Sequence, residues 1–430
     1  MGKTGWMVAA ALSLGVVACG GGGGGSSSTV STTGNSSNSN GTSGDAVNSG
    51  SVTVVNASAV PTSSSAINTV PVTVSSAGFQ DQPMVKVTVC APNSNAASSC
   101  TTISNVLVDT GSYGLRVFAS ALPATLGALT ARTDSLSGKA VTECVVFASG
   151  HAWGSVRGAD VRIGNETAID LPVHILADPS LPAEPSACAV NTAIAGASDL
   201  GANGILGVGV KSQDCGAPCV TNSLAWYYFA TDSTSSTRIT VPLGNQVTNP
   251  VARFATDNNG VILEMPQVPD SGTAVATGTL VFGIDTRSNN ALAGTGATLL
   301  ATTDGGNFNA TYNGRSFTGN AFFDSGSNGL FFQDASIPST GSFFTPVSTL
   351  GREATISASN LSGATIGFNI ANASTQFGTG NRAFNNVGGY MSGSFDFGMP
   401  FFYGRHVYYG LTGQTSTGGG TGPYVAFTSS

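Results

Sequence analysis

The chain of 430 residues has 9% charged residues and 58 glycines, whereas an average soluble protein has about 25% charged residues and about 7% glycine. The 41% of hydrophobic residues is enough for a large core, so the chain as a whole is expected to fold. The chain has only 15 basic residues and a net charge of −7, which argues against a nucleic-acid binder and against a basic membrane-surface helix. It has three histidines (His151, His174 and His406), which argues against a multi-histidine metal site.

Residues 1–18 have the features of an export signal. Lys3 precedes the apolar run from Trp6 to Ala18, which is shorter than the ~20 residues of a transmembrane helix. The run ends VVAC and resembles the lipobox of bacterial lipoproteins, which implies that the mature chain begins at a lipidated Cys19 and is anchored in a membrane by acyl chains. The alternative is an ordinary signal peptide with a chance cysteine. Gly20 after this cysteine is similar to outer-membrane lipoproteins, which implies an exported protein that is periplasmic or surface-facing.

Residues 19–65 follow as a stretch of Gly, Ser, Thr and Asn with almost no large apolar side chain. Such a segment cannot bury enough surface to offset its ordering entropy. We expect a flexible tether with a mean span of about 35–40 Å.

Six cysteines remain after Cys19, and an even number in an exported chain suggests three disulfides. Six thiols allow 15 pairings. Local pairing favours Cys90–Cys100 across a hairpin loop and Cys215–Cys219 within CGAPC, which leaves Cys144–Cys188. A zinc site that uses CGAPC is the less favoured alternative.

The body of the chain predicts an all-β fold, because short β-branched and aromatic runs alternate with Gly, Asn, Asp and Ser. Long amphipathic helical periodicity is absent, and only residues 119–129 and 221–229 are candidate helices. The expected strands include residues 70–74, 84–89, 106–108, 160–164, 279–283 and 406–411.

One segment of the chain recurs. Residues 105–118 read NVLVDTGSYGLRVF and residues 320–333 read NAFFDSGSNGLFFQ, so they share Asn, Asp, Gly, Ser, Gly and Leu at matched positions. Each copy is an apolar strand that ends in Asp-[Thr/Ser]-Gly-Ser. The repeat indicates an internal duplication, although Asp is also common in ordinary turns.

The repeated motif places Asp109 and Asp324 at the ends of two strands, where they leave the core. A glycine follows two residues later and permits a sharp turn, and the flanking hydroxyls can orient each carboxylate. In a duplicated fold the motifs would meet, and two carboxyls ~3 Å apart share one proton. One can then activate a water while the other protonates a carbonyl oxygen, with no metal or cofactor. The supporting residues are Thr110, Gly111, Ser112, Ser325, Gly326 and Ser327.

These motifs resemble those of the pepsin-like aspartic peptidases, which implies a bilobal β architecture and a polypeptide substrate. Residues 203–210 (NGILGVGV) and 395–402 (FDFGMPFF) are similar to the apolar-apolar-Gly segments that support the two Asp turns, although Asp396 stands where the family has Ile or Leu. The resemblance implies a first lobe over residues 66–270 and a second lobe over residues 271–430. More narrowly, residues 203–219 and 256–272 resemble exported bacterial lipoproteins of unknown function, which share this core.

Residues 147–164 resemble the β-hairpin flap of the same peptidases, with Phe147, Gly150, His151 and Trp153 near its tip. Phe147 aligns with the flap tyrosine and lacks its hydroxyl. Arg116 replaces the tryptophan that usually bonds this tyrosine. His151 or Trp153 is a candidate polar group for the tip, although His151 fits a surface or stem position better than a catalytic one. His174 and His406 lie in strand-like runs and are expected to be structural.

We therefore expect a monomeric aspartic-type endopeptidase at the bacterial envelope, with Asp109 and Asp324 as the catalytic pair. The alternative is a catalytically inactive, peptidase-like surface module that binds a peptide or an envelope polymer in the same groove. The aromatic residues from Phe395 to Tyr409 favour core packing over a sugar-binding platform. Signatures of a Ser-His-Asp hydrolase, a P-loop, a Rossmann fold or an HExxH metalloprotease are missing.

Overall fold

The computed structural model describes residues 57–94 and 97–429. The predicted signal peptide, Cys19 and the tether up to residue 56 lie outside these residues. For residues 57–65 the prediction of a flexible tether is wrong, because Ala57 is buried and the Ala59 N–H donates to the Gly404 carbonyl (2.8 Å). Among the helices of the described ranges, none has the length and apolar character needed to cross a membrane.

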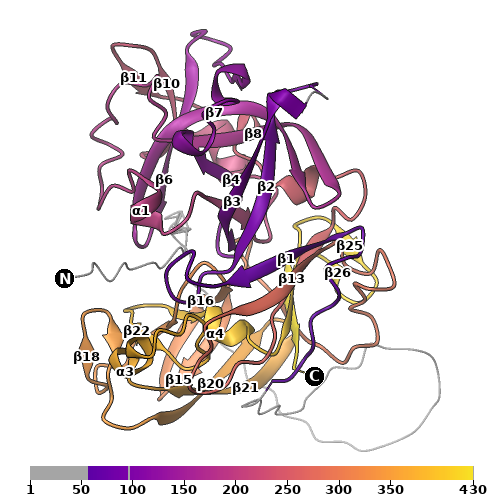
Figure 1. The fold of residues 1–430 in the computed structure, drawn as a ribbon, viewed down its shortest axis with the longest axis vertical. Helices are drawn as coiled ribbons and strands as arrows, with labels where there is room; N and C mark the ends of the chain where they lie inside the picture. The colour runs from indigo at the N-terminus through magenta and orange to yellow at the C-terminus, as the bar shows by residue number, and fades with distance from the viewer. Residues whose placement is uncertain (1–56, 95–96, 430) are drawn as a thin grey trace, which may run out of the picture.

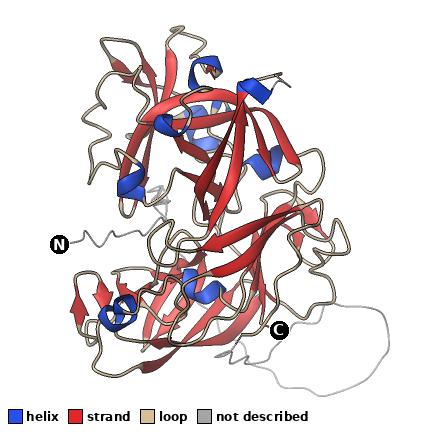
Figure 2. Cartoon of the chain, in the orientation of Figure 1, coloured by secondary structure: helices blue, strands red, loops and turns tan. Residues whose placement is uncertain are grey.

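Strands dominate the fold, as the sequence predicts (Figure 2). The larger of two extended sheets has 16 strands in the order β11-β10-β6-β7-β8-β4-β9-β3-β2-β1-β13-β12-β24-β27-β14, with β5 paired to β7. Its strands are β1 (Thr69–Val74), β2 (Met84–Cys90), β3 (Cys100–Asp109), β4 (Tyr113–Phe118), β5 (Thr130–Ala131), β6 (Ala140–Phe147), β7 (Gly150–Ile163), β8 (Glu166–Leu176), β9 (Gly204–Val208), β10 (Tyr227–Thr231), β11 (Ser236–Arg238), β12 (Gly260–Glu264), β13 (Ala276–Phe282), β14 (Thr298–Ala301), β24 (His406–Gly410) and β27 (Tyr424–Thr428).

The second extended sheet has nine strands in the order β18-β19-β22-β17-β23-β16-β15-β20-β21. These are β15 (Phe308–Tyr312), β16 (Arg315–Asp324), β17 (Leu330–Phe332), β18 (Ser339–Thr340), β19 (Phe343–Phe344), β20 (Leu350–Ala358), β21 (Leu361–Ile370), β22 (Gly388–Tyr390) and β23 (Phe395–Gly398). A small hairpin pairs β25 (Thr415–Ser416) with β26 (Gly420–Thr421).

The helices are short. The α-helices are α1 (Ala197–Leu200), α2 (Ala217–Thr221), α3 (Ala373–Gly378) and α4 (Met399–Phe402), and the 3-10 turns are η1 (Ala97–Ser99), η2 (Ala119–Ala121), η3 (Leu126–Ala128), η4 (Leu243–Asn245) and η5 (Pro250–Arg253).

The two ends of the described chain meet along the larger sheet. Strand β1 pairs antiparallel with β13 over six residue pairs, and β13 continues through β12 and β24 to β27. In Figure 1, β1 and β13 cross between an upper body coloured indigo to magenta and a lower body coloured orange to yellow. The architecture is therefore bilobal and all-β, as the Asp repeat predicts.

The core of the molecule is continuous through both sheets. A single cluster of buried apolar side chains runs from Val70 to Phe427. The aromatic residues near the C-terminus belong to it, and the rings of Phe323 and Phe401 stack at 4.1 Å between their centroids. Because Phe395, Phe401 and Tyr409 are all buried, the interpretation of this segment as core is confirmed.

The two candidate helices were misjudged. Residues 119–129 form only the turns η2 and η3, because Pro123 between them lacks the backbone N–H that a continuous helix needs. The prediction of a helix over 221–229 is wrong: α2 ends at Thr221 and β10 begins at Tyr227. The aromatic residues of β10 pair with β6 instead, and this pairing outweighs a local helical preference.

The structure joins the cysteines as local pairing predicts, in Cys90–Cys100, Cys144–Cys188 and Cys215–Cys219. Cys90 and Cys100 are directly opposite each other on β2 and β3. Because both sulfurs of CGAPC are consumed in a disulfide, the zinc alternative for this segment is wrong.

The disulfides differ in the length of chain that they close, which predicts unequal contributions to stability. The Cys144–Cys188 bond spans 44 residues and the Cys215–Cys219 bond spans 4. Loop-closure entropy then predicts a loss of about 4 kcal/mol in the free energy of unfolding for Cys144→Ala/Cys188→Ala and of about 2 kcal/mol for Cys215→Ala/Cys219→Ala. Urea unfolding of both double variants tests this order, and equal losses would contradict it.

Candidate functional site

The two Asp turns have the same architecture in both halves of the chain. Strand β3 ends at Asp109 and runs parallel to β9, with Asp109 opposite Gly207. Strand β16 ends at Asp324 and runs parallel to β23, with Asp324 opposite Gly398. A Cβ atom at residue 207 would lie 2.6 Å from the backbone nitrogen of Tyr113, so only glycine lets the supporting strand approach the turn.

Each Asp carboxyl accepts the same pair of hydrogen bonds within its own turn. The Gly111 N–H donates to Asp109 Oδ1 (2.8 Å) and the Ser112 hydroxyl donates to Oδ2 (2.5 Å). In the second half, the Gly326 N–H donates to Asp324 Oδ1 (2.8 Å) and the Ser327 hydroxyl donates to Oδ2 (2.8 Å). These four donors fix the orientation of both carboxyls.

A reciprocal pair of hydrogen bonds joins one turn to the other. The Thr110 N–H donates to Ser325 Oγ (3.1 Å), and the Ser325 N–H donates to Thr110 Oγ1 (2.9 Å). The Ser325 hydroxyl in turn donates to the Val108 carbonyl (2.7 Å). Because Thr110 and Ser325 follow the two Asp residues directly, these bonds hold the strand ends face to face.

The two Asp side chains meet at this junction. The position of a Cβ atom on Gly111 would be 2.7–2.8 Å from all three carboxyl atoms of Asp324. Asp109 and Asp324 are both fully buried, and each carboxyl is among the groups that set the pKa of the other. Burial and then repulsion by Asp324 raise the pKa of Asp109 well above its ordinary value, and burial raises the pKa of Asp324. Two such carboxyls hold one proton between them.

A pocket of about 250 Å³ adjoins the junction. Its lining includes Thr110 and Gly111 of the first turn and Ala148 of the β6–β7 hairpin. Its apolar lining residues include Phe322 and Met391. Since Gly111 both lines this pocket and faces the Asp324 carboxyl, a molecule in the pocket would lie next to the Asp pair.

The predicted flap is an antiparallel hairpin of β6 and β7, with Phe147 opposite Gly150 at its tip. Phe147 points into an apolar cluster and is almost fully buried. The guanidinium of Arg116 lies 6.0 Å from the centre of its ring. The tip of the hairpin therefore contacts the body through Phe147 and Arg116.

His151 and Trp153 lie in the hairpin stem and have partners of their own. The ring of His151 contacts Asn191 Oδ1 (3.0 Å) and Glu184 Oε2 (2.9 Å). Trp153 packs edge-on against Phe229, with 5.5 Å between the ring centres. Neither side chain supplies a polar group to the Asp pair.

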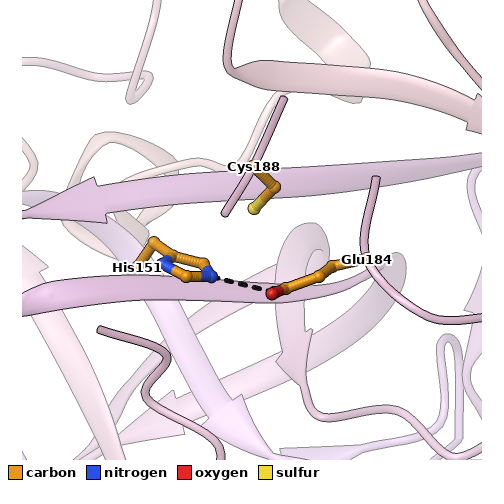
Figure 3. Close-up of side chains that lie close together, drawn as sticks. All are labelled: His151, Glu184 and Cys188. Atoms are coloured by element: carbon orange, nitrogen blue, oxygen red, sulfur yellow. Dashed lines mark hydrogen bonds and ion pairs between the residues drawn. The ribbon is translucent and has the colours of Figure 1, made fainter. Parts of the chain in front are cut away.

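His151 and Glu184 also form part of a three-residue group that includes Cys188 (Figure 3). The three side-chain donor atoms lie within 4.8 Å of one another. The sulfur of Cys188 is bonded to Cys144, so it is not a thiolate ligand. The two remaining groups are hydrogen-bonded to each other, which accounts for their proximity.

A buried ionic cluster under the hairpin was not predicted from the sequence. Arg116 pairs with Glu143 (2.8 Å) and Asp214 (3.1 Å), and the Tyr228 hydroxyl donates to Asp214 (2.6 Å). His174 lies 2.9 Å from Glu143, and burial followed by the charge of Arg116 lowers the pKa of His174 well below its usual value. The only signal in the sequence was an Arg inside an otherwise apolar strand.

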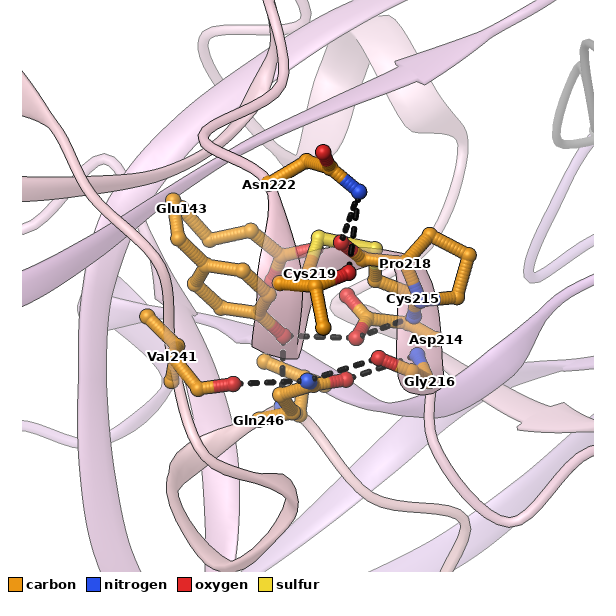
Figure 4. The surroundings of a disulfide bond; sticks show 12 residues. Glu143, Asp214, Cys215, Gly216, Pro218, Cys219, Asn222, Val241 and Gln246 are labelled. Atoms are coloured by element: carbon orange, nitrogen blue, oxygen red, sulfur yellow. Dashed lines mark hydrogen bonds between the residues drawn. A yellow bond between two sulfur atoms is a disulfide. The ribbon is translucent and has the colours of Figure 1, made fainter. Parts of the chain in front are cut away.

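The Cys215–Cys219 disulfide holds one member of this cluster in place. Asp214 precedes Cys215 directly, and the side chain of Gln246 bonds to both backbone groups of Gly216 and to the Val241 carbonyl (Figure 4). This local network fixes the loop that carries Asp214 against Arg116.

Residues 64–427 match a protein family that is described as a protein of unknown function, DUF3443. The chain belongs to this family. Among solved structures, the DUF3443 chain is similar to an aspartic proteinase from Irpex lacteus, with 15% identity, a TM-score of 0.51, and coverage of 84% of this chain and 97% of the proteinase. No curated protein matches the sequence. The likeness establishes a pepsin-like fold for this member of the DUF3443 family.

The bonds between the turns predict a sharp effect of removing one hydroxyl. Thr110→Val leaves the buried Ser325 N–H without its acceptor, which is expected to lower the free energy of unfolding by about 1–3 kcal/mol. The matched control is Thr102→Val, because the Thr88–Thr102 hydroxyl pair is exposed to solvent and its loss should change stability by at most about 0.5 kcal/mol. Urea unfolding measures both, and similar effects would argue against the structural role of Thr110.

Proposed function

We propose that this protein is an aspartic-type endopeptidase of the bacterial envelope, in which Asp109 and Asp324 activate water between them. The observation that carries the proposal is the contact of two fully buried carboxyls at the ends of duplicated turns. In a purely structural pair of turn residues, two neighbouring carboxylates would lower the stability of the fold, because their negative charges repel. An acid–base pair requires this arrangement.

The proposed reaction needs one proton on the pair at the start. The ionised carboxyl takes a proton from a water molecule as the water oxygen bonds to the carbonyl carbon of the peptide. The protonated carboxyl gives its proton to the carbonyl oxygen. The resulting tetrahedral diol then collapses: the carboxyl that took the proton from water gives it to the amide nitrogen, the C–N bond breaks, and a diol hydroxyl returns its proton to the other carboxyl. No covalent intermediate with the protein forms.

Two features of the surroundings support a polypeptide as substrate. The hairpin tip contributes Ala148 to the pocket beside the Asp pair, so a bound chain would lie between the tip and the turns. The pocket wall formed by Phe322 and Met391 suits an apolar side chain next to the scissile bond. The pepsin-like fold supports the same assignment.

The proposal places the folded body at a membrane through Cys19. Its support is the VVAC sequence after a short apolar run, followed by a Gly/Ser-rich stretch before the first described residue. An enzyme tethered in this way would act on polypeptides at the envelope surface.

The activity is tested with Asp109→Asn and Asp324→Asn. We expect each change to lower kcat/KM for an unfolded polypeptide by about 10²–10⁴-fold, since each removes one partner of the proton transfer. The matched control is Asp81→Asn. Asp81 is also fully buried with a raised pKa, but it bonds Tyr403 and the Phe384 N–H away from the pair. Full activity in the Asp109→Asn/Asp324→Asn protein would refute the proposal, and ligand retention without turnover would favour a binding module.

The pH dependence of the activity of the wild-type protein is a second test of the proposed proton sharing between Asp109 and Asp324. Below the lower pKa both carboxyls are protonated and no base is present, and above the upper pKa both are ionised and no acid is present. Because burial and mutual repulsion raise the pKa of Asp109, activity should persist well above the ordinary Asp pKa of about 3.9 and fall at higher pH. A profile that rises continuously with pH would contradict a shared proton.

The membrane anchor is tested separately with Cys19→Ala in the full chain. Expressed in a two-membrane bacterium, the native chain should incorporate labelled palmitate and sediment with membranes. The variant should lose the label. Equal labelling of both proteins would show that Cys19 is not the acylation site.

A further inference from the structure

A surface segment between β8 and α1 crosses the tip of the flap hairpin. This segment, residues 184–194, which we call the strap, bonds to the start of β7. The His151 N–H donates to the Thr192 carbonyl (2.9 Å), and the Ile194 N–H donates to the His151 carbonyl (2.7 Å). A parallel bridge between His151 and Ala193 lies at the same place. The strap therefore pairs with the hairpin like a short additional strand.

The close approach of the strap depends on the glycine that begins β7. A Cβ atom on Gly150 would lie 2.5 Å from the Thr192 carbonyl oxygen and 2.8 Å from Cγ1 of Ile194. Phe147 lies opposite Gly150 and packs in the same apolar cluster as Ile194. The strap thus contacts the tip of the hairpin through its backbone and through one buried side chain.

The side chain of Asn191 in the strap contacts both arms of the hairpin. Its amide nitrogen donates to the Phe147 carbonyl at the end of β6 (3.1 Å), and its amide oxygen lies 3.0 Å from the ring of His151 on β7. Because a carbonyl only accepts hydrogen bonds, the nitrogen must face Phe147, which leaves the oxygen for His151. The other ring nitrogen of His151 contacts Glu184 Oε2 (2.9 Å) at the start of the strap (Figure 3). One amide therefore links β6, β7 and the strap.

A disulfide also connects the strap to the hairpin. Cys188 in the strap is bonded to Cys144 of β6, the strand that ends at Phe147. Both cysteines are fully buried, whereas Asn191 and Thr192 are exposed. An exposed segment with few buried contacts detaches locally at a lower cost than the unfolding of the body. The hydrogen bonds of the strap therefore determine how firmly it holds the tip.

The tip that the strap contacts is the part of the hairpin next to the Asp pair. Ala148, which directly follows Phe147, lines the same pocket as Thr110 and Gly111 of the first Asp turn. Among the described residues that line this pocket, none belongs to the strap. The strap would therefore act on a molecule in the pocket through the hairpin.

We propose that the strap holds the flap hairpin in a fixed position beside the pocket, and that Asn191 is a positioning residue for substrate binding. The role in binding rests on the peptidase function proposed above. Phe147 offers no side-chain hydrogen bond, so its main-chain carbonyl is the polar group through which Asn191 holds the tip. A tip that is already ordered loses less conformational entropy when a polypeptide binds. The strap thereby strengthens binding and leaves the proton transfers of the Asp pair unchanged.

Hydrogen exchange of the full-length protein tests the coupling between strap and hairpin without any substrate. Asn191→Leu removes both amide contacts at an exposed position, so the fold should remain intact. Exchange in residues 145–152 and 190–194 should become about threefold to tenfold faster, because local opening costs less. Exchange in β20 and β21 of the second sheet should not change. Asn191→Gln keeps an amide and should retain most of the protection.

The matched control for this experiment is Asn222→Leu. The exposed side chain of Asn222 also donates to a backbone carbonyl, that of Pro218 (3.3 Å), but this partner lies in α2 and not in the hairpin. The control should leave the exchange of residues 145–152 unchanged. The proposal is overturned if Asn191→Leu does not alter hairpin exchange, or if exchange rises equally in the hairpin and in β20 and β21.

Kinetics test the positioning role. Asn191→Leu should raise KM for an unfolded polypeptide about threefold to tenfold and leave kcat unchanged, because the tip must then be ordered on binding. Asn191→Gln should restore most of the native KM. A merely structural role would instead reduce the fraction of active molecules and lower kcat at constant KM. That result, or native kinetics in Asn191→Leu, would refute the role in binding.

The two experiments separate this proposal from the proposed function. A native protein that cleaves no polypeptide would refute the peptidase proposal. The exchange of residues 145–152 in Asn191→Leu would still decide whether the strap holds the hairpin.

Discussion

The contact between Asp109 and Asp324 is the interaction on which the rest of the site depends. Two carboxyls that share a buried position repel each other and lose their hydration. The reciprocal bonds of Thr110 and Ser325, together with the donors of each turn, offset this penalty. The absence of a side chain on Gly111 leaves the space that Asp324 occupies. Sheet pairing, glycine placement and hydroxyl placement are all consistent with one requirement, which is to hold two acids together.

Much of this arrangement could be predicted from the sequence because its signals are local. The Asp-[Thr/Ser]-Gly-Ser repeat marks both turns, and alternation of β-branched runs with turn residues marks the strands. The spacing of the cysteines was sufficient for the pairing, since Cys90 and Cys215 each find a partner within ten residues. In each case the residues that decide the structure are neighbours along the chain.

The features that could not be predicted depend on contacts between distant strands. Nothing in the sequence distinguishes Glu143 and Asp214 from other acidic residues. They contact Arg116 only because β6 and the loop before α2 pack against β4. The departure at Asp396 was visible, but not that its carboxyl would be fully buried. The β10 strand was mistaken for a helix because its partner β6 lies more than 80 residues earlier. In both cases the choice of a distant partner strand is not marked by a local sequence pattern.

The continuous core has a consequence for how the molecule loses its structure. Apolar side chains from Val70 to Phe427 form one cluster, and β1 joins β13 along the seam between the lobes. Neither lobe can open fully without exposing surface that the other lobe covers. We therefore expect the two lobes to stabilise each other against unfolding. Damage to the packing far from the Asp turns lowers the population of assembled sites without altering the chemistry of the sites that remain.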